Sequence, residues 1–501
     1  MHRARCDTGG RSIRADQQLI RPMNAHFLSR VREAYEMPVT VSALSGPRPL
    51  PLVGNLPEFV RGNVSHRVLE SWADTYGLTY RFRLPDLDAV ATADPAIIDV
   101  VLRRRPDDFR RSAVMATVID EIAPHGVFTA EGERWRRLRK VATRSLNAAY
   151  LRQYFTTITK VTGRLVRQWE SAATTAGPID VLDLMMRYTL DVTAALAMGH
   201  DLNSLESTGD GLHSRIPTLF PAFGRRLGAP VPYWRYVKLP QDRRLDETVR
   251  EIEAVVLQSY AKARDRMATG AEPANFLEAL VQPLDDEPQI TEKEVFGNVL
   301  TMLFAGEDTT SAAAAWALHY LAANPDIAAK VRAEADEVLG DQQLPTDPAT
   351  IGRLKYAEAT VNEALRLRPV APYQVFEPTR DLTLTTRDGT KLFLPAGLTI
   401  FALLSYGALR DTERFPDPEA FRPQRWLDGK LPPEALPFAP FGNGPRFCPG
   451  RNLALIEATI ATSVLARGFD LEEDHSGGPV RERMAFGVFP ENLRLRARAR
   501  L

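Results

Sequence analysis

Hydrophobic residues recur along this chain mainly at helical spacing, and the longest such stretch covers residues 291–323. It is nearly uniformly apolar, a pattern that predicts a helix buried on all sides. Thr291 and Glu294 form a T-x-x-E capping box at its start, and Asn324-Pro325 marks its end. A helix of about 32 residues spans roughly 48 Å at ~1.5 Å per residue, so we expect this one to cross the whole molecule.

Shorter patterns predict further helices and a few strands. Helices are expected at 95–104, 326–339, 353–367 and 451–467, and strands at 78–84, around 381–403 and in the tail from 493. Residues 131–285 are expected to be mostly helical, with an irregular Pro- and Gly-rich break over about 205–242. Residues 411–447 are expected to be irregular. These patterns predict a mainly α (α+β) fold, helix-rich, with small peripheral β-sheets and one long central helix.

Composition and charge narrow the class of protein. The 501 residues are 44% hydrophobic and 25% charged, as in ordinary soluble globular proteins. Lys and Arg together number 63, as do Asp and Glu, so the net charge of zero gives no support for a nucleic-acid partner. The long helix is not expected to span a membrane, because Glu307, Asp308 and two threonines interrupt its middle.

The arginines of the N-terminal segment hint at a transit peptide, but its two aspartates and few serines favour a plain flexible tail. The first 45 residues contain no apolar run near the ~18–20 residues needed to cross a bilayer, and no signal-peptide core. Two cysteines, Cys6 and Cys448, cannot make a disulfide framework, and such low cysteine use fits a reducing, cytoplasmic location. We expect residues 1–44 to be a flexible tail and residues 45–501 to be a single domain.

One cysteine lies in an unusual loop, "PFAPFGNGPRFCPGRNLA", at residues 437–454. Its glycines allow tight turns and close approach to a flat surface, and freed backbone N–H groups can stabilise a thiolate. An arginine fork suits carboxylates, and a phenylalanine shields one side from water. A thiolate beneath a planar macrocycle with carboxylates would use all of these parts, and haem is such a ligand. The residues are Phe441, Gly442, Gly444, Arg446, Cys448 and Gly450.

A lone cysteine in a glycine-rich turn is more often structural than reactive. The ten-residue pattern F-G-x-G-x-R-x-C-x-G reverses that preference, because it resembles the signature of the cytochrome P-450 family without a gap. The resemblance implies that Cys448 ligates the iron of haem b, and it extends over roughly residues 45–499.

The middle of the long helix carries "AGEDTTS", residues 305–311. Taken alone, this could be a helix kink lined by a carboxylate with a partner, or a widened turn that holds water beside a cofactor. The run also resembles the family's oxygen-binding motif. That resemblance implies that Thr309 would hydrogen-bond the dioxygen and that Asp308 would relay protons toward it.

Two further pairs resemble family elements. "EALR" places Glu363 and Arg366 at i, i+3, a spacing common by chance. The family's E-x-x-R pair joins an arginine of the later Pro-rich segment, here Arg425, and such a triad would brace the cysteine loop. "ERWRRLRK" places Trp135 and Arg139 on one helix face, like the W-x-x-x-R pair that reaches the haem propionates.

The remaining charges near these motifs are less specific. We expect the arginines and lysine around Trp135 to form a solvated helix face; with Arg451 they could also dock an acidic partner. These are Arg134, Arg136, Arg137 and Lys140. Many family members carry a third propionate cation after the E-x-x-R helix. Phe376 stands near that place and Arg380 is too close to the next turn, so this cation stays unassigned.

The resemblance implies a haem-dependent monooxygenase that inserts one oxygen atom of O2 into an apolar organic substrate by hydroxylation or epoxidation. Too few residues follow Cys448 for a reductase domain, so we expect electrons from a ferredoxin or flavodoxin with its NAD(P)H reductase, and a monomer. A haem-thiolate peroxygenase, isomerase or dehydratase is the alternative, followed by a haem-based sensor. By resemblance, substrate-pocket candidates are Phe304, Ala305, Val370, Ala371, Tyr373 and Val488, within the segments 370–373 and 486–489.

Overall fold

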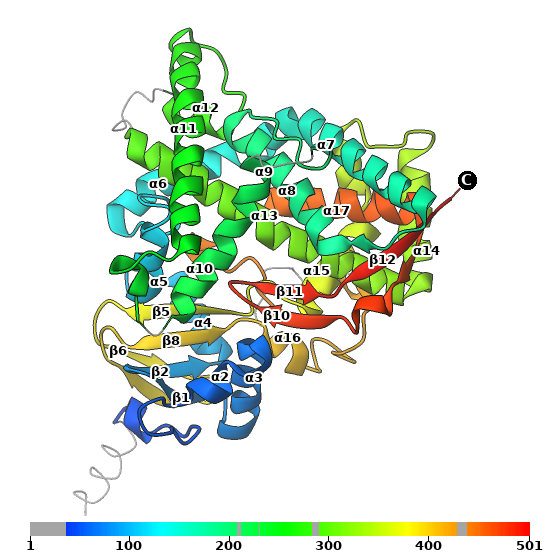
Figure 1. Cartoon of the computed structure of the whole chain (residues 1–501). Coiled ribbons are helices and arrows are strands. Elements are labelled where there is room, and N and C mark those ends of the chain that lie inside the picture. Colours follow the sequence, from blue (N-terminus) through cyan, green and yellow to red (C-terminus); the bar gives the residue numbers. More distant parts are fainter. Residues whose placement is uncertain (1–36, 208–211, 230, 283–289, 428–437, 501) are drawn as a thin grey trace, which may run out of the picture.

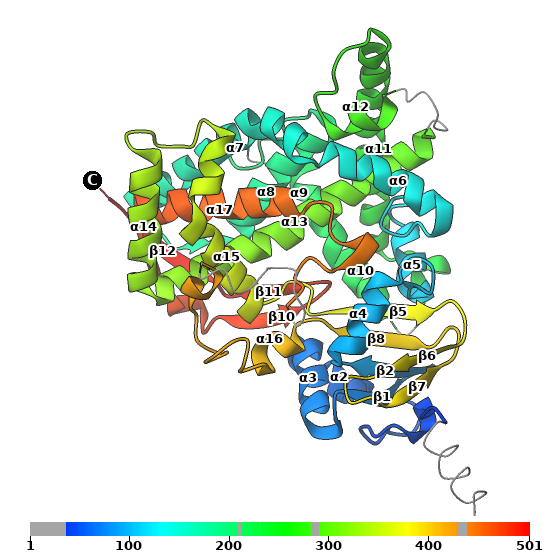
Figure 2. The ribbon, with the colours of Figure 1, turned by 180° about the vertical axis from the view of Figure 1, so that it is seen from behind.

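The computed structural model describes residues 37–207, 212–229, 231–282, 290–427 and 438–500. Helices form one part of the molecule, and a β-rich part lies below them in Figure 1 and in the opposite view of Figure 2. The β10–β11 hairpin (Arg481–Met484 and Val488–Glu491) lies where the two parts meet in both views. Within the described residues, no helix is long and apolar enough to cross a membrane.

The helices account for most of the described chain. Their bounds are α2 Leu56–Phe59, α3 Ser65–Tyr76, α4 Pro95–Arg103, α5 Ala113–Asp120, α6 Gly132–Ser145, α7 Ala148–Thr175, α8 Val181–Met198, α9 Leu212–Arg215, α10 Leu219–Gly228, α11 Pro240–Ala268, α12 Phe276–Val281, α13 Glu292–Ala323, α14 Pro325–Leu339, α15 Lys355–Leu367, α16 Tyr406–Arg410 and α17 Arg451–Gly468. The predicted helix-rich class with small sheets is confirmed.

The strands form small sheets at the edge of the helical body. One sheet has the order β1-β2-β8-β5-β3, another the order β4-β12-β9, and β6–β7 and β10–β11 are hairpins. The bounds not yet given are β1 Thr79–Leu84, β2 Leu87–Thr92, β3 Phe109–Arg111, β4 Ile179–Asp180, β5 Tyr373–Pro378, β6 Leu382–Thr385, β7 Lys391–Leu394, β8 Thr399–Leu403, β9 Phe469–Glu473 and β12 Arg494–Ala499.

Helix α13 is the predicted central helix. It begins after Thr291, whose side chain caps the backbone N–H of Glu294 while the Glu294 side chain returns to the Thr291 backbone, as the capping box predicts. The helix packs against α8, α15 and α17, and most of its side chains are buried. The expectation of burial on all sides is wrong at one place, because Ala305 in its middle is exposed.

Two expectations about irregular segments change with the structure. The predicted break over 205–242 contains α9 and α10. Pro221 occupies the first turn of α10, where a backbone N–H has no partner within the helix, so proline does not break it there. The predicted tail, 1–44, lies outside the described residues up to position 36, and Val39 pairs with Leu392 of β7 in an isolated parallel bridge.

Candidate functional site

The cysteine loop is shaped by glycines that no other residue could replace without strain. Gly442 and Gly444 have φ angles of 73° and 71°, in the left-handed region that favours glycine. A Cβ at Gly444 would lie 2.4 Å from the carbonyl oxygen of Leu102 at the end of α4. The backbone N–H of Cys448 donates to the carbonyl of Phe441 at 2.8 Å, which closes the loop. The loop therefore presents Cys448 in a fixed position, packed on α4.

Opposing effects act on the pKa of the Cys448 thiol. Burial raises its pKa, while backbone hydrogen bonds from Gly450 and Arg451 and the positive charges of Arg139 and Arg451 lower it, leaving the pKa above its usual value. Helix α17 begins at Arg451, so the helix N-terminus also points its positive end toward this region. Cys448 is a free thiol and Cys6 lies outside the described residues. A bound metal ion would supply the further positive charge that a stable thiolate needs here.

Two predicted cations lie beside the loop. Arg139 Nη2 donates to the carbonyl oxygen of Phe447 at 2.6 Å, and its guanidinium lies 4.8 Å from the centre of the Phe447 ring. Arg446 donates to the carbonyl oxygen of Ala130 at 2.7 Å and forms an ion pair with Glu131. Its guanidinium stacks 4.5 Å from the ring of Trp135, which is buried. The structure thus brings Trp135, Arg139 and Arg446 to one side of the cysteine loop.

Two further arginines, which no sequence motif indicated, join this cluster. Arg105 is only 3% exposed, and its guanidinium lies 4.7 Å from the centre of the Phe376 ring. Burial and the neighbouring charges of Arg111 and Arg446 hold the pKa of Arg105 well below its usual value. Burial and the charge of Arg446 lower the pKa of Arg111 to about 10. The cluster is therefore short of negative charge.

Some hydrogen-bond donors of the arginine cluster also lack acceptors. Among the described residues, Nε and Nη2 of Arg105 and Nε of Arg446 are buried without a hydrogen-bond partner. The acid facing them is Glu131, whose carboxylate is 3.9 Å from Arg105. Buried guanidinium groups are costly unless their donors are satisfied, so this arrangement suits a ligand that brings carboxylates to the cluster.

The predicted triad behind the loop is assembled around one buried carboxylate. Glu363 accepts two hydrogen bonds from Arg366, at 2.9 and 2.8 Å, and one from Arg425 at 2.9 Å. Trp426 Nε1 and the backbone N–H of Arg422 donate to it as well, both at 2.9 Å. Glu363 and Arg366 are fully buried. The pair therefore ties α15 to the irregular segment that leads to the cysteine loop.

The acid–alcohol stretch of α13 lies where the helix faces a cavity. Thr309 donates its hydroxyl to the carbonyl oxygen of Ala305 at 2.7 Å. Asp308 is 3% exposed, and burial raises its pKa to about 7, opposed by the positive charge of Arg483. Burial also raises the pKa of Glu307, with a contribution from Asp308. Both acids therefore hold protons more firmly than carboxyl groups in water.

The apolar cavity at this stretch is lined almost wholly by hydrophobic side chains. Phe304 and Ala305 line it as predicted, and so does Phe486 of the predicted late turn. The lining residues that were not predicted from the sequence come from α5 and the loop after it, from α10 and from α13. They are Ile119, Ile122, Ala123, Phe128, Phe223 and Thr301.

The other four predicted pocket residues do not line this cavity. Val370 and Val488 are buried in the core, where the backbone N–H of Val488 donates to the carbonyl oxygen of Val370 at 2.9 Å. Tyr373 packs on the α3 side, with its hydroxyl 3.2 Å from that of Ser65. Ala371, which lies between Val370 and Tyr373 in the sequence, is half-buried. Backbone pairing and core packing therefore use these residues, whereas the turn of the hairpin reaches the cavity.

Comparison with known proteins accounts for this combination of loop, triad and helix. The family model described as Cytochrome P450 matches residues 44–496. The chain belongs to the cytochrome P450 family. The family is one of haem-dependent monooxygenases that bind haem b, which supports oxygen insertion as the reaction class and haem b as the cofactor.

The chain is similar to curated members of the cytochrome P450 family from several kingdoms. It is 28% identical over 470 residues to the self-sufficient cytochrome P450 monooxygenase CYP505E3 of Aspergillus terreus, covering 91% of this chain and 43% of that protein. It is 26% identical over 430 residues to the protein LUTEIN DEFICIENT 5, chloroplastic, of Arabidopsis thaliana, covering 81% and 69%. It is 26% identical to cytochrome P450 4d2 of Drosophila melanogaster, covering 85% and 88%. The chain thus spans less than half the length of its self-sufficient relatives.

The cysteine loop and the arginine cluster fit the haem b of the cytochrome P450 family. Haem b carries two propionates, and the cluster contains buried guanidinium donors without partners among the described residues. Gly450, two residues after Cys448, has no side chain, and a Cβ there would lie 3.8 Å from the sulfur of Cys448. The donor set therefore matches both the metal and the carboxylates of the cofactor.

The predicted solvated basic face of this cytochrome P450 is partly neutralised. Arg137 forms an ion pair with Glu294 in the first turn of α13, and Arg134 lies 3.6 Å from the same carboxylate. Arg136 is paired with Asp107 at 2.7 Å. The expectation that these arginines are simply solvated is wrong for Arg134 and Arg137, because α6 packs near the start of α13 and Glu294 attracts them.

Proposed function

We propose that this cytochrome P450 oxidises an apolar organic substrate by hydroxylation or epoxidation, with Cys448 as the iron ligand and electrons supplied by a separate protein. The observation that carries the proposal is the position of Asp308 and Thr309. They lie on the turn of α13 that exposes Ala305, and Ala305 lines an apolar cavity. A proton source and a hydrophobic pocket therefore adjoin one another, as oxygen insertion into an apolar molecule requires.

The cofactor's carboxylates would be held by the arginine cluster. In this proposal Arg139 and Arg446 take the roles that their motifs predict, and Arg105 and Arg111 supply the cations that no motif indicated. When bound, haem supplies the activation of O2 and the transfer of its oxygen atom, and thiolate ligation favours O–O cleavage. The indole of Trp135 supports Arg446 through the stacking contact described above.

The protein's own contribution to proton delivery centres on Asp308. Its pKa near 7 means that the carboxyl can both hold and release a proton at neutral pH, the property expected of a general acid. The hydroxyl of Thr309 now donates to the carbonyl of Ala305. Rotation about its χ1 angle would release that hydroxyl from the carbonyl oxygen and make it available as a hydrogen-bond donor to O2.

The electrons would enter at the cysteine loop. Phe447, next to Cys448 in the chain, is 43% exposed, and Arg139 stacks on its ring. An acidic ferredoxin or a flavodoxin could dock on this cationic and aromatic surface, and such docking would weaken with increasing salt. Much of the predicted basic face is already paired, so the docking area we propose is Arg139 with Phe447 rather than the whole of α6.

Turnover assays test the proposal directly. The purified haem-loaded protein would be supplied with NAD(P)H, a surrogate ferredoxin and its reductase, together with a panel of lipids, terpenes and aromatic compounds. We expect oxygenated product that requires O2 and reductant, and we expect Thr309→Ala to consume NAD(P)H while forming much less product. Product formation with peroxide alone, and none with reductant, would instead indicate a peroxygenase.

A further inference from the structure

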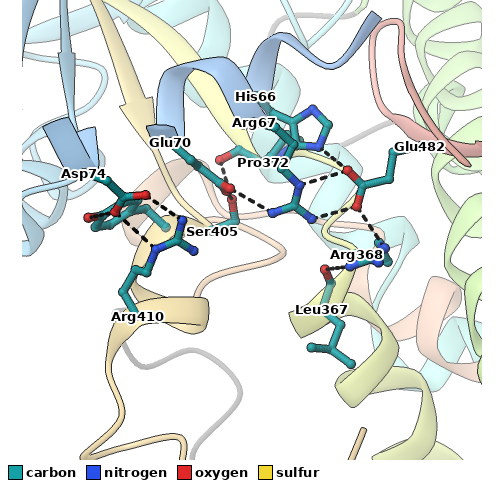
Figure 3. Close-up of polar contacts among 11 residues, drawn as sticks. His66, Arg67, Glu70, Asp74, Leu367, Arg368, Pro372, Ser405, Arg410 and Glu482 are labelled. Atoms are coloured by element: carbon teal, nitrogen blue, oxygen red, sulfur yellow. Dashed lines mark hydrogen bonds and ion pairs between the residues drawn. The ribbon is translucent and has the colours of Figure 1, made fainter. Parts of the chain in front are cut away.

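A single carboxylate on the β10–β11 hairpin binds three basic side chains. Glu482 Oε2 accepts from Arg67 Nε at 2.9 Å and lies 3.0 Å from His66 Nε2. Its Oε1 accepts from Arg67 Nη2 at 2.7 Å and lies 2.8 Å from Arg368 Nε. Figure 3 shows the three side chains converging on Glu482 from α3 and from the segment after α15. The Glu482 side chain is 12% exposed, so these contacts are largely shielded from water.

The contacts continue from Arg67 into the core of the β-rich part. Arg67 Nη1 donates to Glu70 at 2.8 Å, and the Ser405 hydroxyl donates to the other oxygen of Glu70 at 3.1 Å. The same hydroxyl is 3.3 Å from the carbonyl oxygen of Pro372. Figure 3 shows these contacts of Glu70. Glu70 is 3% exposed. The hairpin is thus joined through Glu482 and Arg67 to α3, to the end of β8 and to the segment that precedes β5.

The hairpin carries two residues that matter at the proposed active site. Phe486, in its turn, lines the cavity and packs edge-on against Phe223, with ring centres 5.0 Å apart. Arg483, next to Glu482, is the cation that opposes the upward pKa shift of Asp308. Strand β11 is held at the core by Val488, whose carbonyl oxygen also accepts from Trp316 Nε1 at 3.2 Å. Strand β10 is held by Glu482.

Without the negative charge of Glu482, the basic side chains that now bind it would repel one another. Arg67, Arg368 and the imidazole of His66 gather around the carboxylate, and Glu70 would remain as the anionic partner of Arg67 among the described residues. Hydrogen bonds from Arg67 and His66 and the charges of Arg67 and Arg368 hold the pKa of Glu482 well below its usual value, so the carboxylate is ionised at neutral pH. Loss of one partner in a shielded ionic cluster leaves the others uncompensated.

We propose that Glu482 is a positioning residue that fixes the β10–β11 hairpin by binding His66, Arg67 and Arg368 at once, and thereby sets the Phe486 wall of the cavity and the specificity of the enzyme. This inference rests on the proposed function, because it takes the cavity as the substrate site. Glu482 does not itself touch the cavity, so its effect on binding is transmitted through the turn at residues 485–487.

The test compares Glu482→Gln with Glu491→Gln in the haem-loaded protein. Glu491 is the last residue of the same hairpin, and it is exposed. The probe is 4-phenylimidazole, whose nitrogen binds haem iron and whose phenyl group needs the cavity; imidazole has no such group. We expect Glu482→Gln to raise the dissociation constant of 4-phenylimidazole roughly tenfold, since misplacing a wall by about 1 Å can cost more than that. Imidazole binding and Glu491→Gln should change little.

Hydrogen exchange provides the second measurement and does not depend on the ligand. The backbone N–H groups of Ala485 and Val488 are hydrogen-bonded, to Gly487 and Val370. We expect a peptide covering 482–489 to exchange faster in Glu482→Gln, while a peptide over β9 stays unchanged. Arg368→Gln removes one of the three partners and keeps the others, so it should shift both readouts in the same direction by less. Arg368→Gln therefore provides the test if Glu482→Gln does not fold.

The outcomes separate the inference from the proposed function. If wild-type protein fails to bind 4-phenylimidazole at the iron, the proposed function falls and the inference falls with it. If wild-type protein binds the probe while Glu482→Gln and Arg368→Gln leave both binding and exchange unchanged, the inference alone is wrong. Equal effects on imidazole and 4-phenylimidazole would also overturn it, because the change would then lie at the iron rather than at the wall.

Discussion

The guanidinium of Arg105 lies 4.7 Å from the centre of the Phe376 ring, so a cation from the segment after α4 occupies the place where β5 offers only an aromatic side chain. Members of the family that use a cation from the chain after the E-x-x-R helix would have it near Phe376. In this chain the cation next to Phe376 is Arg105, from the segment after α4. The alternative candidate, Arg380, forms an ion pair with Asp108 at 2.8 Å. As proposed above, Arg105 would supply the propionate cation that no motif indicated.

The first prediction concerns Arg105. Arg105→Gln removes a buried cation with unpartnered donors, so the protein should release haem faster. One hydrogen bond to a charged group contributes about 1.5–3 kcal/mol, which corresponds to a rate increase of roughly tenfold or more. Transfer of haem from the ferric protein to an excess of apomyoglobin measures the rate. Arg104→Gln is the matched control, because Arg104 is half-exposed and paired with Asp108; equal rates in the two variants would contradict the assignment.

The second prediction follows from the raised pKa of Asp308. The folded protein holds this proton up to about pH 7, whereas an unfolded aspartate releases it near the ordinary value of 3.8. Wild-type stability therefore decreases as pH rises through that window. Asp308→Asn does not titrate, so its free energy of unfolding relative to wild type should increase by about 2–3 kcal/mol from pH 5 to pH 8.

Urea denaturation of both proteins at the two pH values measures this difference. Asp265→Asn is the control, because Asp265 is exposed on α11 and its variant should follow the wild-type pH dependence. A constant difference between Asp308→Asn and wild type across pH 5–8 would mean that Asp308 is already ionised in the folded protein.

The third prediction concerns the triad. Glu363 is fully buried and accepts hydrogen bonds from two arginines, a tryptophan and a backbone N–H. Glu363→Gln would leave Arg366 and Arg425 without their carboxylate, and breaking a buried pair in this way costs about 3–5 kcal/mol. The midpoint of urea unfolding should fall accordingly, while Lys355→Gln, at an exposed position at the start of the same helix, should change it little. Comparable midpoints would show that the triad does not brace the loop.

Local signals in the sequence were enough for the long central helix. The capping box at Thr291 and Glu294 and the proline after Asn324 are short-range features, and α13 begins and ends where they predict. Helix α10 was missed because Pro221 and its glycines suggested a break, although a proline in the first turn is compatible with a helix. Patterns of this kind report on neighbours along the chain and do not show where tertiary packing will favour a helix.

The residues of the candidate site also fall into two groups, those that sequence motifs identify and those that only the structure identifies. Cys448, Arg139 and Glu363 lie in motifs with fixed spacing, so they could be named from the sequence. Arg105 follows two arginines at the end of the predicted helix 95–104, and only its burial beside Phe376 distinguishes it from them. Ile122 and most of the other cavity residues are ordinary hydrophobic side chains brought together by the fold. Residues predicted to ligate or support the cofactor can therefore be recognised from sequence motifs, whereas the residues that shape the pocket cannot.

The absorption spectrum of the ferrous protein with carbon monoxide tests most directly whether Cys448 ligates the iron. A cysteine thiolate ligand gives this complex a red-shifted main band, which a nitrogen ligand does not. We predict that the wild-type protein shows the red-shifted band and that Cys448→His loses it while still binding haem. A red-shifted band that persists in Cys448→His would mean that another residue ligates the iron, and it would contradict the role of the cysteine loop on which the proposed function depends.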